Sequence, residues 1–268
     1  SPLIDCSAKM NLYDKDYLSL SHDEMKDVEA YRAHSSSRSG IYRPSDLIFP
    51  PKHVEFYTSL FPNHFLPQGI DKDPNFNQEN LSDFVKLIDT QGVTERDILN
   101  FIRDRRAWFL VASMTIHGFD FGHHALYLFP EFSLGGHMTP DYLLIGKNSD
   151  GWHFVFVEME APFGATIKDG DLGLPLRKGI KQVKDWKIWL ERNFNFLYDS
   201  LRRHMSPLAI LEEEFFQYDS TRMNYVVVAG RSSEFSDYTR RARRDLKKDS
   251  NTQLLHYDRL VSESEYYL

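Results

Sequence analysis

The sequence has 268 residues, of which 41% are hydrophobic and 26% charged, and its formal net charge is −7. These values are typical of a folded protein, and they argue against a membrane protein and against one that coats nucleic acid by charge alone. Because there is a single cysteine, a disulfide framework is excluded and we expect a reducing, cytoplasmic location.

The first ninety residues contain no pattern of catalytic or metal-binding side chains. Their composition and periodicity predict, in chain order, a loop at Tyr31–Arg43, a short helix at His53–Phe61, a loop at Pro67–Gln78 and a helix at Asn80–Thr90. Gln91-Gly92 offers a domain boundary. We therefore predict that residues 1–92 serve regulation or oligomerisation, and that residues 93–268 form the main domain.

The main domain is expected to begin with a helix that Thr94 caps, followed by a meander of three strands. The expected elements here are a helix after Thr94, helix or turn at Trp108–Thr115, and strands at Ala125–Phe132, Thr139–Ile145 and Trp152–Glu160. The turn formers of residues 146–151 close a hairpin between the last two strands.

The C-terminal hundred residues alternate predicted helices and strands. In order these are a Gly-rich loop at Ala161–Pro175, helices at Leu176–Arg192 and Phe196–Phe216, a strand at Met223–Ala229, a helix at Glu234–Lys248 and a strand at Thr252–Tyr257. Pro207 is expected to break or kink the second helix. The whole order predicts an α/β fold, with a mixed sheet flanked by helices.

Three carboxylates are expected to converge at one end of the predicted hairpin. Asp141 begins its first strand, and Glu158 ends its second, so antiparallel pairing brings them side by side. Glu160 lies two residues further and points to the same side as Glu158. Because a buried cluster of acids is costly without a cation, we predict a metal site at Asp141, Glu158 and Glu160.

These residues resemble a known signature. Pro140-Asp141 followed by Glu158-Met159-Glu160 is similar to the motif of PD-(D/E)XK nucleases, with Glu160 where lysine is usual. Gln182 and Trp186 resemble the Gln-x-x-x-Tyr motif of a helix that lies near the metal in that superfamily. The resemblance also implies a catalytic role for Glu95, for which a solvated first-turn glutamate is an equal interpretation.

Four segments in order narrow the resemblance to the Shedu family of antiphage nucleases. They are Phe156–Pro162, Lys178–Trp186, Tyr225–Arg231 and Leu254–Leu260. The resemblance implies a bacterial immunity protein with a restriction-endonuclease-like fold, which cleaves DNA, in phage infection, with Mg²⁺ or its substitute Mn²⁺. It also implies homo-oligomers, as tetramers, and control by a variable N-terminal region.

Several basic residues are candidates for nucleic-acid contact. Lys178 and Lys181 lie on the helix beside the loop after Glu160, and either could replace the missing motif lysine in space. Arg231 and His137 are further candidates. The basic run from Arg240 to Lys248 has two interpretations, a phosphate-contacting stripe or an ordinary charged surface helix.

Three functions remain open from the sequence. The first is an active, metal-dependent DNA endonuclease. The second is a catalytically weakened nuclease-fold protein that binds DNA or a partner and acts as a sensor, which the glutamate at position 160 motivates. The third is an α/β interaction protein whose acids are accidental. Plasmid nicking with and without Mg²⁺ separates the three.

Overall fold

The computed structural model describes residues 11–36, 50–67, 74–116, 118–119, 124–136, 138–164, 166–168 and 171–268. The chain divides into two compact units. One unit comprises residues 1–65 and 201–212, and the other comprises residues 66–200 and 213–268. Among the described helices, none has both the length and the apolar character needed to span a lipid bilayer.

The smaller unit is built on two helices, α1 (His22–Ser36) and α2 (Lys52–Thr58). Val28 of α1 packs against Val54 and Tyr57 of α2, with Tyr31 at the edge of this cluster. The loop expected from Tyr31 onward is therefore helical up to Ser36, because Tyr31 continues the apolar face of Val28 one turn later. The rest of that expected loop, residues 37–43, lies outside the described residues.

The larger unit contains a five-stranded sheet in the order β1-β2-β3-β6-β7. Its strands are β1 (Ala125–Pro130), β2 (Tyr142–Asn148), β3 (Gly151–Met159), β6 (Met223–Val228) and β7 (Thr252–Leu255). The first three form an antiparallel meander, whereas β6 pairs in parallel with β3, and β7 in parallel with β6. The predicted mixed sheet is confirmed.

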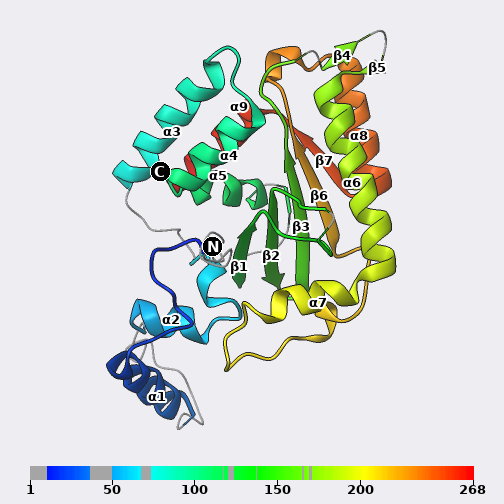
Figure 1. The fold of residues 1–268 in the computed structure, drawn as a ribbon. Coiled ribbons are helices and arrows are strands. Elements are labelled where there is room, and N and C mark those ends of the chain that lie inside the picture. The colour runs from blue at the N-terminus through cyan, green and yellow to red at the C-terminus, as the bar shows by residue number, and fades with distance from the viewer. Residues whose placement is uncertain are drawn as a thin grey trace, which may run out of the picture. The chain divides into compact units, whose positions relative to one another are not determined.

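Helices cover both faces of this sheet (Figure 1). On one face lie α6 (Leu174–Asn193) and α8 (Asp237–Ser250), and on the other lie α3 (Pro74–Asp89), α4 (Glu95–Asp104), α5 (Trp108–Ala112) and α9 (Tyr257–Ser264). Because both faces are covered, the central strand β3 carries the continuous apolar run Phe154–Val157, in which every side chain is fully buried.

Two further expected loops contain regular structure. Helix α3 begins at Pro74, inside the expected loop Pro67–Gln78, because proline is well accommodated in the first turn of a helix. A short hairpin, β4 (Ile167–Lys168) with β5 (Asp171–Leu172), lies within the expected Gly-rich loop.

The long helix expected at Phe196–Phe216 is wrong. Helix α7 covers only Asn195–Arg202, and a short 3₁₀ turn follows at Glu213–Phe215. Pro207 cannot donate a helical hydrogen bond, and it disfavours helical geometry at Ser206. Ser206 instead donates from its hydroxyl to the carbonyl of Tyr57 at 2.6 Å, so this stretch packs into the smaller unit.

Candidate active site

The β2–β3 hairpin brings Asp141 and Glu158 together. Tyr142 pairs with Val157 in the ladder, so the residues just beyond them, Asp141 and Glu158, lie on facing chains at the same end. The backbone N–H of Met159 donates to Oδ2 of Asp141 at 2.7 Å, which fixes this carboxylate against β3. The adjacency expected from the hairpin is therefore present in the fold.

Glu158 and Glu160 are almost fully buried, with 2% and 4% of their surface exposed. Within the described part of the chain, Oε2 of Glu158 and Oε1 of Glu160 have no hydrogen-bond partner. Carboxylate oxygens without a partner are expensive to bury, so they are the atoms at which a cation would be most stabilising.

The backbone of Glu160 is held from two sides. Its N–H donates to the carbonyl of Val228 at 2.8 Å, which continues the parallel pairing of β3 and β6 by one residue. Its carbonyl accepts a hydrogen bond from the buried hydroxyl of Tyr257 at 2.6 Å. Nothing in the sequence indicated this role for Tyr257, because a tyrosine that follows a short apolar strand is most simply interpreted as a core residue.

Glu95 and Lys178 complete the cluster from two helices. Thr94 caps α4 through a capping box with Asp97, which places Glu95 at the first helical position. The amine of Lys178 on α6 donates to Oε2 of Glu95 at 2.8 Å and to Oε2 of Glu160 at 3.0 Å. Among the described residues, Lys178 is the one cation paired with these acids.

The electrostatics of the cluster are dominated by burial and by like charge. Burial raises the pKa of Asp141 and of Glu158 well above the ordinary range, and the neighbouring carboxylates raise both further. Burial also raises the pKa of Glu160, against the opposing effect of Lys178. Burial lowers the pKa of Lys178, but its hydrogen bonds to Glu95 and Glu160 outweigh this and raise it above its usual value.

Helix α6 packs unusually closely on the sheet beside the acids. A Cβ on Gly179 would lie 2.6 Å from a methyl group of Val227 and 3.5 Å from Cγ of Glu160. Gln182 lies one turn beyond Lys178, on the same face of the helix, and its Oε1 is buried without a partner among the described residues. The close packing at Gly179 thus keeps this face of α6 at the acids.

The donor set suits a hard divalent cation. Asp141, Glu158 and Glu160 supply carboxylate oxygens, the ligand type that Mg²⁺ prefers, and two of these oxygens are unpartnered. As the side chains stand, no group of three or more His, Cys, Asp or Glu among the described residues is arranged to hold a metal ion. The Met159 N–H occupies one oxygen of Asp141, and Lys178 occupies one of Glu160, so metal ligation would require these side chains to move.

Of the other residues predicted to contact nucleic acid, Lys181 and Arg231 form ion pairs within the protein. Lys181 is exposed and pairs with Asp185 at 2.8 Å. The guanidinium of Arg231 binds Asp258 at 2.7 Å and also binds Asp89, so it links the end of α3 to the start of α9. A DNA contact by Arg231 would compete with these two carboxylates. His137 lies outside the described residues.

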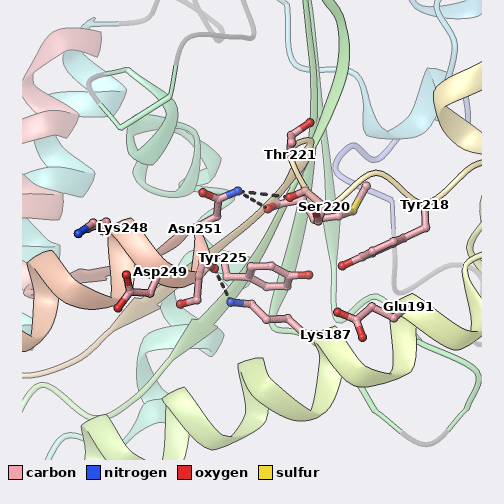
Figure 2. Close-up of a pocket in the computed structure, with 11 residues that line it drawn as sticks. Lys187, Glu191, Tyr218, Ser220, Thr221, Tyr225, Lys248, Asp249 and Asn251 are labelled. Carbon is pink, nitrogen blue, oxygen red and sulfur yellow. Dashed lines mark hydrogen bonds between the residues drawn. The ribbon is translucent and has the colours of Figure 1, made fainter.

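A separate cavity of about 280 Å³ lies at the opposite end of β6, where Met223 and Tyr225 begin the strand (Figure 2). Lys187 donates there to the carbonyl of Ser250 and, at 2.9 Å, to the hydroxyl of Thr252, and its amine lies 4.4 Å from the centre of the Tyr225 ring. This amine is satisfied by its neighbours. The cavity therefore lies between α6 and the starts of β6 and β7, and it is separate from the carboxylate cluster.

Comparison with known protein families identifies a family for this chain. A family model described as "Shedu protein SduA, C-terminal" matches residues 92–261. No curated protein and no solved structure matches the chain.

Proposed function

Because the chain belongs to the Shedu family, we propose that it is a metal-dependent endonuclease that hydrolyses phosphodiester bonds of DNA. Membership of this family supports a role in defence against phage. The observation that carries the proposal is the cluster of three buried carboxylates, with unpartnered oxygens on Glu158 and Glu160, at the ends of β2 and β3.

We assign the metal to Asp141, Glu158 and Glu160, with Mg²⁺ as the cofactor and Mn²⁺ as its substitute. A bound divalent cation would neutralise charge on the phosphate and acidify a water molecule. Glu160 is placed to accept a proton, because one of its oxygens is free and the other is held by Lys178. Gln182 presents an unpartnered amide oxygen that can orient a water molecule.

Lys178 takes the part that a motif lysine plays in related nucleases. Its amine is a near neighbour of Glu160, although it comes from a different element of the fold. An ammonium group at this place can stabilise negative charge that develops on the phosphate. This contact favours an active enzyme over a weakened, sensor-like protein. We further propose that the enzyme acts in the bacterial cytoplasm on phage DNA and works as a homo-oligomer, a tetramer.

The test is plasmid nicking by the full chain with Mg²⁺, with Mn²⁺ and with EDTA. Asp141→Asn keeps an oxygen that can accept from Met159 N–H, so the variant should fold, whereas cleavage should fall by about 100-fold or more through the loss of a metal ligand. Asp150→Asn, in the turn at the other end of the same hairpin, is the matched control and should cleave normally.

Three outcomes would contradict the proposal. Wild-type nicking rates in folded Asp141→Asn would contradict the assignment of the metal to Asp141. DNA binding without cleavage in either metal would favour the sensor function. Cleavage of RNA in preference to DNA would correct the substrate class.

A further inference from the structure

The positive charge predicted to meet DNA is largely neutralised within the protein. Lys178 binds two glutamates, Lys181 binds Asp185, and Arg231 binds two aspartates. A polyanion gains most from cations that have no internal partner. Among the described residues, one cluster of cations without an ion-pair partner lies on a single face of α8.

Arg240, Arg243, Arg244 and Lys247 follow the spacing i, i+3, i+4, i+7 on α8, which places them on a single helix face. Arg240 pairs with Asp237 at 3.4 Å. The described residues supply no ion-pair partner to Arg243, Arg244 or Lys247. On the adjacent face of the helix, by contrast, Arg241 lies 3.9 Å from Asp245.

Arg243, Arg244 and Lys247 line a groove of about 190 Å³ beside the edge strand β7. Arg259, from the first turn of α9, lines the same groove, and none of the acidic residues in the described part of the chain does. Arg259 uses its Nε to bind Glu263 at 2.7 Å. Burial lowers the pKa of Arg243, and so do Arg259, Arg240 and Arg244, which shows that like charges crowd around it.

The groove lies within reach of a duplex bound at the acids. Met159 pairs with Val228, and Val228 pairs with Leu255, so the groove residue Leu255 lies two strands from the end of β3 and at the same level. Two strand spacings amount to about 10 Å, and a duplex rises about 3.4 Å per base pair. A DNA backbone therefore needs to continue only about three base pairs beyond the cleaved bond.

We propose that Arg243, Arg244, Lys247 and Arg259 form a binding groove for the phosphate backbone of duplex DNA, beside the cleavage site. This role rests on the proposed function and extends it, since it assigns the contact that holds the substrate outside the metal site. Attraction to the helix dipole explains a lysine in the last turn of α8. It does not explain Arg243, or the approach of Arg259 from a second helix.

The test measures DNA binding in EDTA, where cleavage plays no part. Arg243→Gln/Lys247→Gln removes two groove charges that are four residues apart on the helix. Arg241→Gln/Lys248→Gln removes two charges from the adjacent face of the same helix and is the matched control. Fluorescence anisotropy with a labelled duplex of about 20 base pairs, over a series of NaCl concentrations, gives the dissociation constant and its dependence on salt.

Each phosphate contact contributes about 0.9 to the slope of log affinity against log salt, so the groove variant should lose about 1.8 from this slope. At 0.1 M salt each lost contact corresponds to about an eightfold weaker affinity. Circular dichroism of each variant checks that α8 remains folded, and Arg243→Lys, which keeps the charge, should bind like the wild type.

Equal slopes for the groove variant, the control and the wild type would overturn the groove, and so would equal losses in the groove variant and the control. If the groove variant bound free pyrophosphate more weakly but kept the wild-type salt dependence of DNA binding, the groove would be a site for small anions, and the proposal would be overturned. Failure of the proposed function is a different result, because a chain that binds DNA through the groove but never cleaves would still show the predicted loss of slope.

Discussion

Replacing Lys178 by methionine removes the amine that contacts Glu95 and Glu160 while it keeps the length of the side chain. Coulomb's law with an effective dielectric constant of about 20 gives about 5.5 kcal/mol for unit charges at the 3.0 Å that separates Lys178 from Glu160. Because 48% of the lysine side chain is exposed, solvent screening reduces this to about 1–2 kcal/mol. We expect Lys178→Met to destabilise the fold by about that amount.

A double-mutant cycle isolates this interaction. Urea unfolding in EDTA of the wild type, Lys178→Met, Glu160→Gln and the double variant should give a coupling energy of about 1–2 kcal/mol. The exposed pair Lys181–Asp185, at 2.8 Å on the same helix, is the matched control, and its cycle with Lys181→Met and Asp185→Asn should give about 0.3–0.5 kcal/mol. Equal coupling in the two cycles would refute the argument that burial of Glu160 strengthens its contact with Lys178.

Three further variants test the surroundings of the site. Gly179→Ala places a Cβ 2.6 Å from Val227, so unfolding should be easier by about 1–3 kcal/mol. Its cleavage should fall at least tenfold as α6 moves from the acids, and unchanged cleavage would contradict this. Burial lowers the pKa of Lys187 from 10.5 to about 8. Between these two pH values the unfolded chain binds more protons than the folded chain does, so the folded state becomes more stable as the pH rises. The free energy of unfolding of the wild type should therefore increase relative to that of Lys187→Met over this range. Urea midpoints at pH 7.5, 8.5 and 9.5 measure this, and a constant difference would count against it. Arg231→Met leaves Asp258 without its cation and should cost about 1–3 kcal/mol of unfolding free energy. Its DNA affinity in EDTA should stay within twofold of the wild-type value. A tenfold loss of affinity with unchanged stability would show instead that Arg231 contacts DNA.

The hairpin that carries the acids could be predicted from local patterns. The apolar run Phe154–Val157 and the turn formers before it leave one reasonable register, and that register sets Asp141 against Glu158. The helix after Thr94 was predicted as well, because its cap is specified within four residues. These features need only interactions between residues that are close in the sequence or joined by one short turn.

The role of Lys178 could not be derived in the same way. Lys178 and Lys181 are three residues apart on α6, and the sequence offered both as substitutes for the motif lysine. Which of them meets Glu160 depends on the rotation of α6, and the contact of Gly179 with Val227 on β6 bears on that rotation. A contact between segments so distant in the sequence leaves no local periodic signal.

The prediction of one helix over Phe196–Phe216 was wrong for a related reason. Its composition favours a helix, but Pro207 interrupts it, and Ser206 finds hydrogen-bond partners near residue 57 instead. Tyr257 was missed because the partner of its hydroxyl, the carbonyl of Glu160, is 97 residues away. Tertiary contacts overrode local preference in one case and gave a new role to a core residue in the other.

The hydrogen bond from Tyr257 to Glu160 decides when, during synthesis of the chain, the backbone of Glu160 can be held in place. The site draws on Glu95, Asp141, Glu158, Glu160 and Lys178, but the hydroxyl that holds the Glu160 backbone comes from a residue 97 positions after it. A ribosome-bound chain that has not yet released that part of the sequence lacks both the edge strand β7 and that anchor. The carboxylate cluster therefore gains this anchor only once residue 257 is free to fold.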